Sequence, residues 1–489
     1  GVLIKGACAS ETLLYHSSDI PLDYGVELRG HGVPTIQGFT MIGQSPGLAV
    51  IDSGLAIVKD VIIMGKMEHG IIVQNLDDDD AFDEVVLEID GVLVTRTMAD
   101  DGQTASSIYG GVFTRIEADE LLVQGGDAMG INVEGSYLQL FNSTVADTEK
   151  FAIRANSSGL DIQNVILDGN TGSGLEFYNS AASIQDVTVS NTGPSANNYA
   201  GDGMFFYRTN VVADRVAMIG NHNSGIYAFG SDATAEFTDL TVSMTQPEQA
   251  NETWGNGLYV MKGATVDILR GTFSHNHHIG VVVEGRETSL TLDDSLITQT
   301  QAEVGTGDYG VGMWATNGAQ AALTEVVILA NHTAGLIAAG DVGLAQDCTE
   351  LGWDAEQCMG NQTNVRLRNV LVQDTQPDPE GDNAGELGTG VQADNGAQME
   401  GRAVIAQGNH FAGVMVRGKG LVERASVESV EEGATEFAEV ERTYAQFSEL
   451  AILDTHVELA TGDYGVGLLV TDGGKGEVSK GVIARAHTA

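Results

Sequence analysis

The chain has 489 residues, with 68 acidic against 23 basic side chains and a formal net charge of -45 at pH 7. This charge repels phosphate backbones and anionic lipid headgroups, so nucleic acid is a poor partner candidate. No apolar run approaches the roughly 20 residues of a membrane-spanning helix, so membrane insertion is not expected. The acidic excess suits cations, or serves as a solvated coat that limits aggregation of a β-rich protein.

An acidic run is the first candidate ligand site along the chain. Carboxylate oxygens are the preferred ligands of Ca²⁺, so the run could hold that ion, which is the one cofactor that the sequence suggests. A solvated acidic loop is the alternative, and the residues do not decide between the two. The carboxylates in question are Asp77, Asp78, Asp79, Asp80, Asp83 and Glu84.

Two short phrases recur through the middle and the end of the chain. The first is Asn-His-x-x-Gly-apolar, and it begins at Asn221, Asn276, Asn331 and Asn409, with a version lacking His at Asn170. The second is Gly-x-Gly-apolar, and it begins at Gly201, Gly255, Gly310, Gly388 and Gly465. The phrases alternate, so the repeat unit is two coils long. From Gly225 to Gly280 and from Gly280 to Gly335 the step is 55 residues.

Runs of four to seven residues with β-branched alternation separate the phrases, as in residues 263–269 and 289–292. Short runs of this kind bounded by Gly, Asn or Asp predict strands, and no helical period is visible. Because every coil repeats the same path, the coils should stack as a single all-β, parallel solenoid over residues 1–489.

The recurring polar and Gly residues have structural explanations. Gly is expected where the backbone needs a positive φ at a tight corner, and Asn tolerates the same region and can hydrogen-bond along the stack. The His residues recur once in every second coil, about 10 Å apart, which is too far to share one metal ion. They are therefore predicted to be corner residues rather than ligands.

Two insertions of about 22 residues lengthen the repeat near its C-terminal end. The first lies at about 342–362 and the second at about 419–443, and both follow the same part of the coil. They should protrude on one side as binding surfaces or as tolerated insertions. The first carries Cys348 and Cys358, whose spacing suits a local disulfide in an oxidising compartment. Cys8 is left over as a small apolar side chain.

Alternation places the second and fourth residues after the closing Gly of each phrase on the outside of the coil. Several of these positions are aromatic, where a solvated sheet face would show Thr, Ser or charges. Two explanations stay open: a loop covers these rings, or they form a binding platform for glycan or protein. The predicted ligand-binding residues are Phe205, Tyr207, Tyr227, Phe229, Tyr259 and Trp314.

With these corners, about residues 25–489 resemble the right-handed parallel β-helix proteins that Gram-negative bacteria secrete or display. That superfamily has the architecture of pectin lyases and includes lyases, polygalacturonases, tailspikes and adhesin passengers. The resemblance implies an extracellular or cell-surface location. Fold alone does not assign a reaction to a member of it.

The enzyme motifs of the superfamily do not match. Gly30-His31-Gly32 is similar to the Gly-His-Gly of polygalacturonases, but the carboxylates that should precede it are missing. Arg115-Ile116 is followed by Glu117 where that family has Lys. A lyase would need cations to neutralise its substrate, and no cluster of Lys or Arg on one face is visible in the sequence.

The sequence therefore predicts a non-enzymatic structural or adhesive β-helix, with no catalytic residues assigned; a polysaccharide-acting lyase or glycoside hydrolase is the alternative. Its expected partners are a glycan or a cell-surface protein. Residues 482–489 match residues 327–334 at five of eight positions, so the chain breaks off within a coil. We therefore expect either a longer polypeptide or end-to-end self-association.

Overall fold

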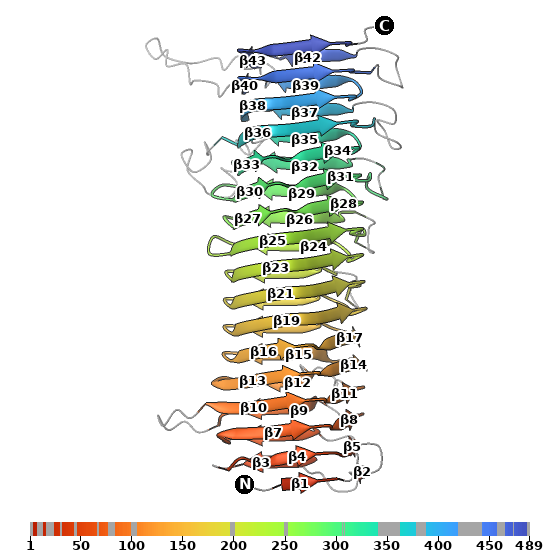
Figure 1. Ribbon diagram of the computed structural model, residues 1–489, viewed down its shortest axis with the longest axis vertical. Coiled ribbons are helices and arrows are strands. Elements are labelled where there is room, and N and C mark those ends of the chain that lie inside the picture. Colours follow the sequence, from red (N-terminus) through yellow and green to blue (C-terminus); the bar gives the residue numbers. More distant parts are fainter. Residues whose placement is uncertain are drawn as a thin grey trace, which may run out of the picture. The chain divides into compact units, whose positions relative to one another are not determined.

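The computed structural model describes residues 3–6, 13–15, 24–29, 32–43, 46–65, 68–76, 84–98, 105–195, 201–248, 253–305, 307, 309–340, 362–377, 388–418, 443–456, 465–472 and 474–486. The chain forms two compact units, Gly1–Leu258 and Tyr259–Ala489. Every regular element in these ranges is a β-strand (Figure 1). Among the same residues, no helix is long and apolar enough to cross a membrane.

Unit 1 contains two parallel sheets, and each coil contributes to both. Sheet 1 of this unit consists of β3 (Val26–Arg29), β6 (Leu48–Ile51), β9 (His69–Gln74), β12 (Ser106–Gly110), β15 (Met129–Glu134), β18 (Ile153–Asn156), β20 (Leu175–Tyr178), β22 (Met204–Tyr207) and β24 (Ser224–Phe229). The next strand, β26 (Asn256–Met261), has residues of both units.

Sheet 2 of unit 1 receives two short strands or one long bent strand from each coil. Its strands are β1 (Leu3–Lys5), β2 (Leu13–Tyr15), β4 (Thr35–Gln37), β5 (Thr40–Ile42), β7 (Leu55–Lys59), β8 (Ile62–Met64), β10 (Val85–Asp90), β11 (Leu93–Thr95), β13 (Thr114–Asp119), β14 (Leu122–Gly126), β16 (Tyr137–Phe141), β17 (Thr144–Thr148), β19 (Gly159–Asp168), β21 (Ala181–Ser190), β23 (Asn210–Ile219) and β25 (Thr234–Ser243).

Unit 2 repeats this arrangement. Its sheet 1 has β29 (Ile279–Glu284), β32 (Val311–Thr316), β35 (Ala334–Ala339), β37 (Thr389–Asp394), β39 (Ala412–Arg417) and β42 (Val466–Thr471). Its sheet 2 has β27 (Thr265–Leu269), β28 (Thr272–Ser274), β30 (Ser289–Asp293), β31 (Leu296–Thr298), β33 (Gln320–Thr324), β34 (Val327–Leu329), β36 (Asn364–Gln373), β38 (Gln398–Gln407), β40 (Tyr444–Phe447), β41 (Leu450–Leu453), β43 (Lys475–Val478) and β44 (Gly481–Ala484).

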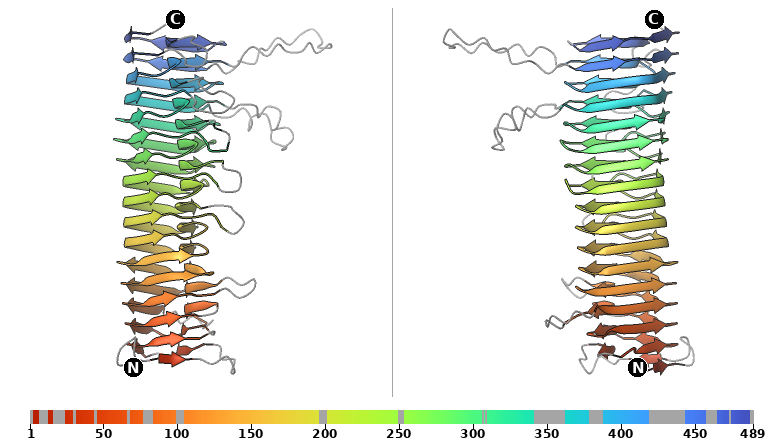
Figure 2. Two further views of the ribbon diagram at one scale, coloured as in Figure 1. Left: turned by 90° about the vertical axis from the view of Figure 1, so that its right-hand side faces the viewer. Right: turned by 60° about the vertical axis from the view of Figure 1, so that its left-hand side comes forward.

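Within each unit, strands of successive coils lie beside one another in chain order (Figure 2). The pairing is parallel and in register; Leu175, for example, is opposite Ile153 in the preceding coil and Met204 in the following one. Alternate side chains of each strand point into the coil, and the core is filled by buried aliphatic residues and by Phe39, Phe177, Phe206, Phe237, Phe273 and Phe447. The predicted all-β, right-handed parallel β-helix is confirmed.

Two successive coils of unit 1 each turn three corners, and a single residue with positive φ occupies each of these corners. In one coil these residues are Ser157, Asn164 and Gly169, and in the next they are Asn179, Asp186 and Asn191. Gly, Asn and Asp adopt this left-handed conformation at the lowest cost, which explains why they bound the strands.

The glycine that closes each phrase has a different role from the one predicted. Gly225 does not have a positive φ; a Cβ on it would lie 2.2 Å from Val242 Cγ1 and 2.6 Å from the Gly257 carbonyl oxygen. The core therefore leaves room for only a hydrogen atom on the α-carbon of Gly225, and no side chain fits there. In the copies of the second phrase that begin at Gly201, Gly255, Gly310 and Gly388, the positive φ belongs instead to this first Gly, for example at Gly201 (φ 108°) and Gly388 (φ 99°).

The phrase Asn is also a core residue rather than a left-handed corner. The Asn221 side chain is 1% exposed, accepts a 3.0 Å hydrogen bond from the Thr192 N–H and donates one of 3.1 Å to the Val189 carbonyl oxygen. Its amide thus bonds to the backbone of the preceding coil, where neither backbone group could reach water. Asn170, Asn331 and Asn409 make the same pair of bonds.

The phrase His follows the Asn and touches the loop of the next coil. His222 Nδ1 lies 3.0 Å from the Pro247 carbonyl oxygen, and His277 Nδ1 lies 3.3 Å from that of Ala302. Such a bond fixes the start of a loop that leads back to sheet 1. Burial lowers the pKa of His277 and of His332.

Several sequence predictions fall outside the described residues. They concern Cys8, the Gly30-His31 pair, the acidic run from Asp77 to Asp83, residues 342–361 with Cys348 and Cys358, and residues 419–442. The proposed disulfide and both insertions therefore stay predictions, as do a single domain and the continuation of the chain.

Candidate ligand-binding face

The outward face of sheet 1 in unit 1 gathers polar and aromatic side chains in two columns. In the first, the register places Arg154, Glu176, Phe205 and Tyr227 on successive strands β18, β20, β22 and β24. In the second, it places Asn156, Tyr178, Tyr207 and Phe229 on the same strands. Parallel strands lie roughly 4.8 Å apart, so neighbours within a column are in contact.

The aromatic side chains form a connected cluster. The rings of Phe205 and Tyr227 have centroids 5.4 Å apart at 80°, and those of Tyr207 and Phe229 are 5.6 Å apart. Tyr178 joins them, with its ring 5.5 Å from that of Phe205. All five side chains are half-buried. We call them the aromatic cluster; they cover one another's edges and leave part of each ring accessible.

A charged group borders the aromatic cluster on the β18 side. Arg154 Nε lies 3.2 Å from Glu176 Oε2, and the guanidinium stands 5.7 Å from the centre of the Tyr178 ring. The Tyr178 hydroxyl donates a 3.0 Å hydrogen bond to Glu176 Oε1. Burial raises the pKa of Glu176 in spite of Arg154, and burial together with the Glu176 carboxylate raises the pKa of Tyr178 to about 12.

Asp202 lies two residues before β22 and is 4% exposed. Burial raises the pKa of Asp202 to about 7, opposed by a hydrogen bond from Asn223 and reinforced by the nearby Glu176 and Glu248 carboxylates. Ser224 stands at the matching position of the next coil, and its buried hydroxyl has no hydrogen-bond partner among the described residues. This part of the face is enclosed, polar and rich in carboxyl groups.

A second polar group lies toward the N-terminal end of the same face. The His69 and Tyr109 rings stack 5.2 Å apart, and the Tyr109 hydroxyl donates a 3.3 Å hydrogen bond to Glu134 Oε2. Burial lowers the pKa of His69. The pattern of a Tyr hydroxyl bonded to a Glu on the outward face thus occurs twice in this unit.

In unit 2 the predicted ligand-binding residues have different surroundings. Tyr259 is only 7% exposed, and its hydroxyl donates a hydrogen bond to Glu284. Trp314 is half-buried, and the Tyr309 ring stacks against it at 6.0 Å. Trp314 therefore presents a partly accessible ring, whereas the Tyr259 ring is covered.

No metal centre is visible in the parts of the chain that the structure describes, where no group of three His, Cys, Asp or Glu could hold an ion. Of the predicted calcium ligands only Glu84 is described, and it is exposed just before β10. The other five lie outside the described ranges, so the calcium site stays a prediction.

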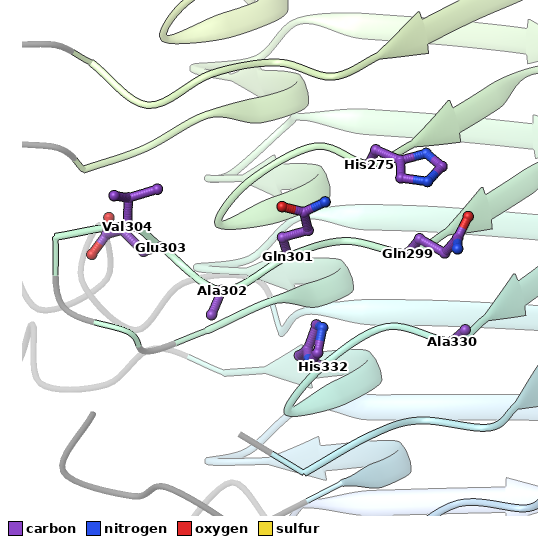
Figure 3. A pocket seen from close by; sticks show the side chains of 8 residues that line it. All are labelled: His275, Gln299, Gln301, Ala302, Glu303, Val304, Ala330 and His332. Carbon is purple, nitrogen blue, oxygen red and sulfur yellow. The ribbon is translucent and has the colours of Figure 1, made fainter. Parts of the chain in front are cut away.

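An open hollow of about 540 Å³ lies at the corner side of unit 2 (Figure 3). Three successive coils line it with His275, Gln299, Gln301, Ala302, Glu303, Val304, Ala330 and His332. His332 is a phrase His, whereas His275, Gln299 and Ala330 occupy left-handed corners. The hollow is polar and open, and its imidazoles are not brought together on one ion.

The sequence prediction found the aromatic half of the face and missed its charged half. Glu176 and Tyr178 are the second and fourth residues after Gly174, so the rule applied to later coils would have identified them. Asp202 and Arg154 became recognisable only from the register.

The sequence analysis found no cluster of Lys or Arg on one face, and this prediction was wrong. Sheet 2 of unit 2 gathers three arginines, Arg366, Arg368 and Arg402, on one face.

The two sheets, the parallel register and the left-handed corners define a right-handed parallel β-helix. Residues 129–328 match a family model described as "Right handed beta helix region". No curated protein matches the sequence.

Two solved structures show limited likeness. One is the A-module of a mannuronan C-5 epimerase from Azotobacter vinelandii, at 11% identity and a TM-score of 0.20, with 93% of this chain and 91% of that chain covered. The other is a variant of a PL6 family alginate lyase, at 9% identity and a TM-score of 0.18, with 99% and 97% covered.

Proposed function

We propose that the protein is a non-enzymatic, carbohydrate-binding β-helix of the cell exterior, and that the aromatic cluster of unit 1 is its glycan platform. The observation that supports this most is the half-buried cluster of Tyr178, Phe205, Tyr207, Tyr227 and Phe229 on a sheet face. The apolar face of a sugar ring packs on an aromatic ring, while hydroxyl groups at its edge seek polar partners. The neighbouring Glu176, Arg154 and Asn156 supply such partners.

The electrostatics of the face favour a neutral glycan. Two arginines stand beside the cluster: Arg154 is already engaged with Glu176, and the guanidinium of Arg208 lies over the Tyr207 ring, 5.0 Å from its centre. The whole chain carries a net charge of -45, so a polyanionic chain lying along this sheet would be repelled. A neutral polysaccharide avoids this repulsion, and its sugar rings can still pack on the aromatic side chains.

A binding assay on neutral polysaccharides tests the proposal directly. Affinity electrophoresis of the full chain through gels containing cellulose, xylan or mannan derivatives should show retardation by at least one of them. The double variant Phe205→Ala/Tyr227→Ala should lose about 1 to 3 kcal/mol of binding free energy, or roughly 5- to 150-fold in affinity. The control Val212→Ala removes an apolar side chain that is 51% exposed on β23 of sheet 2 and should bind normally. Equal binding by the double variant and the wild type would rule out the cluster as the platform.

One observation favours a second candidate, a polysaccharide-acting enzyme. A carboxyl group with a pKa near neutrality suits a general acid, and burial gives Asp202 such a pKa, about 7. Release of reducing ends or of unsaturated products from a polysaccharide, lost in Asp202→Asn, would establish this candidate instead. In the proposed binding role, neither product appears.

A further inference from the structure

Three arginines stand together on the outward face of sheet 2 in unit 2. Arg366 and Arg368 lie two residues apart on β36, so their side chains point to the same side. Arg402 lies on the neighbouring strand β38, where the register puts it directly opposite Arg368. All three are exposed. We call them the arginine patch.

The charges of the arginine patch are poorly compensated within the protein. Arg366 Nε is 3.9 Å from Glu400 Oε2, and their side chains are 79% and 66% exposed, so this ion pair contributes little. In the part of the chain that the structure describes, neither Arg368 nor Arg402 makes an ion pair or a side-chain hydrogen bond. Like charges directly opposite each other on adjacent strands destabilise a sheet.

The composition of the chain makes this arrangement unusual. Acidic residues outnumber basic ones 68 to 23, and other exposed arginines do meet carboxylates, as Arg215 meets Asp186 and Asp214. An external anion would relieve the repulsion between Arg368 and Arg402.

A hollow of about 410 Å³ adjoins the patch and supplies further polar groups. Its lining consists of Arg366, Leu367, Glu400, Gly401, Arg402, Gln446 and Ser448. The Gln446 amide and the Ser448 hydroxyl are exposed at its edge. Guanidinium groups bind the paired oxygens of a carboxylate or sulfate, and amide and hydroxyl groups suit the hydroxyls of a sugar ring.

We propose that the arginine patch is an oxyanion-binding site that takes a single carboxylate or sulfate group carried by a sugar. Two adjacent strands present the patch, so it spans one anionic group rather than a polymer backbone. The surrounding negative charge disfavours long polyanions for the same reason that it disfavours nucleic acid. The arginine patch lies on sheet 2 of unit 2, whereas the aromatic cluster lies on sheet 1 of unit 1. The proposed oxyanion site is therefore independent of the function proposed above.

Calorimetric or NMR titration of the full chain at constant, low ionic strength tests this site. The probes are glucuronic acid, glucose 6-sulfate and glucose, so the first two distinguish carboxylate from sulfate and the third reports binding without an anion. The wild type and the control Arg215→Gln should bind at least one acidic sugar with equal affinity and should not bind glucose. The double variant Arg368→Gln/Arg402→Gln should bind at least 10-fold more weakly.

Added NaCl should weaken binding to the wild type, because the attraction is between exposed charges. Binding of neither acidic sugar by the wild type would overturn the proposal, as would equal binding by the double variant. If the double variant fails to fold, the single variant Arg402→Gln replaces it, and the same two outcomes apply. Removing one of two facing like charges should leave the melting temperature unchanged or raise it.

Discussion

The side-chain amide of Asn223 donates a 2.8 Å hydrogen bond to Oδ1 of Asp202, a carboxyl group that the fold encloses beside the candidate binding face. Asn223 is the residue after the phrase His and has a φ of 62°. The corner conformation thus aims its amide at the neighbouring coil. The same position holds His278, Thr333 and Phe411 in later coils, so a structural corner carries different chemistry from coil to coil.

Asp202→Asn should stabilise the protein at neutral and alkaline pH. Between about pH 4 and pH 7 the folded chain keeps the proton on Asp202 while the unfolded chain releases it, because burial raises the folded-state pKa to about 7. The wild type therefore loses free energy of unfolding as pH rises through this window, on the order of 4 kcal/mol at about 1.4 kcal/mol per pKa unit. Asn keeps the hydrogen bond from Asn223 without the charge.

Thermal unfolding of Asp202→Asn and wild type at pH 4 and pH 8 measures this effect. The variant should unfold at the higher temperature at pH 8, and the difference should vanish near pH 4. Asp232→Asn, at an exposed loop position, is the control and should show no such pH dependence. A variant less stable than the wild type at pH 8 would contradict the prediction.

His278→Asn should protect the protein against acid. Burial lowers the pKa of His278 to about 4, and the Tyr309 ring packs edge-on against it at 4.6 Å. Between pH 6.5 and about 4 the unfolded chain binds a proton at this site and the folded chain does not. The wild type should therefore lose up to about 3 kcal/mol of stability as pH falls through that window.

Asn suits this position because Asn223 occupies it in unit 1 at the same φ of 62°. Urea denaturation at pH 7 and pH 4.5 should show a smaller drop in stability for His278→Asn than for the wild type. The matched control is His275→Asn, an exposed left-handed corner in the same unit with φ 55°. An equal drop in all three proteins would show that His278 is not the group responsible.

Gly225→Ala should destabilise the protein severely. The added methyl would lie within 2.6 Å of both Val242 Cγ1 and the Gly257 carbonyl oxygen, so two neighbouring coils would have to move apart. Overpacking of this kind costs about 1 to 3 kcal/mol, and more where backbone must shift. Gly54→Ala is the control, since no atom lies within 4 Å of its added methyl. Chemical denaturation that gave the two variants the same stability would refute this role of the phrase glycine.

Asn221→Asp should destabilise the protein although it is nearly isosteric. The carboxylate can still accept from the Thr192 N–H but cannot donate to the Val189 carbonyl oxygen, and it places a charge at a site that is 1% exposed. Loss of the donated bond alone leaves a buried acceptor unsatisfied, at a cost of about 1 to 3 kcal/mol. Asn210→Asp, at an exposed strand position of β23, should change the free energy of unfolding by less than about 0.5 kcal/mol. Comparable losses in both variants would argue against the specific role of Asn221.

The sequence predicted the fold well because every coil follows the same path and needs the same kinds of residue at equivalent positions. A strand boundary needs a residue in the left-handed conformation, and a core position needs an aliphatic residue. Because these needs recur in every coil, the same residue types recur at a regular spacing, such as the 55-residue step between Gly225 and Gly280. The phase of the outward aromatic residues was predictable by the same alternation, and Phe205 and Tyr227 do lie side by side on the face. The sequence did not show why an individual Gly is needed, because a Gly required by close packing and a Gly required by a positive φ look identical in a sequence.

By itself, then, the sequence determined the parallel β-helix, its two-coil period and the outward position of the aromatic rings, since these depend on local alternation and repetition. Only the tertiary structure decided which charges meet. Arg154 and Glu176 are 22 residues apart, and Arg368 and Arg402 are 34 residues apart, yet each pair is directly opposite in register. Coil lengths differ from one coil to the next, so the register, and with it the electrostatics of both proposed sites, follows from the folded coils rather than from spacing along the chain.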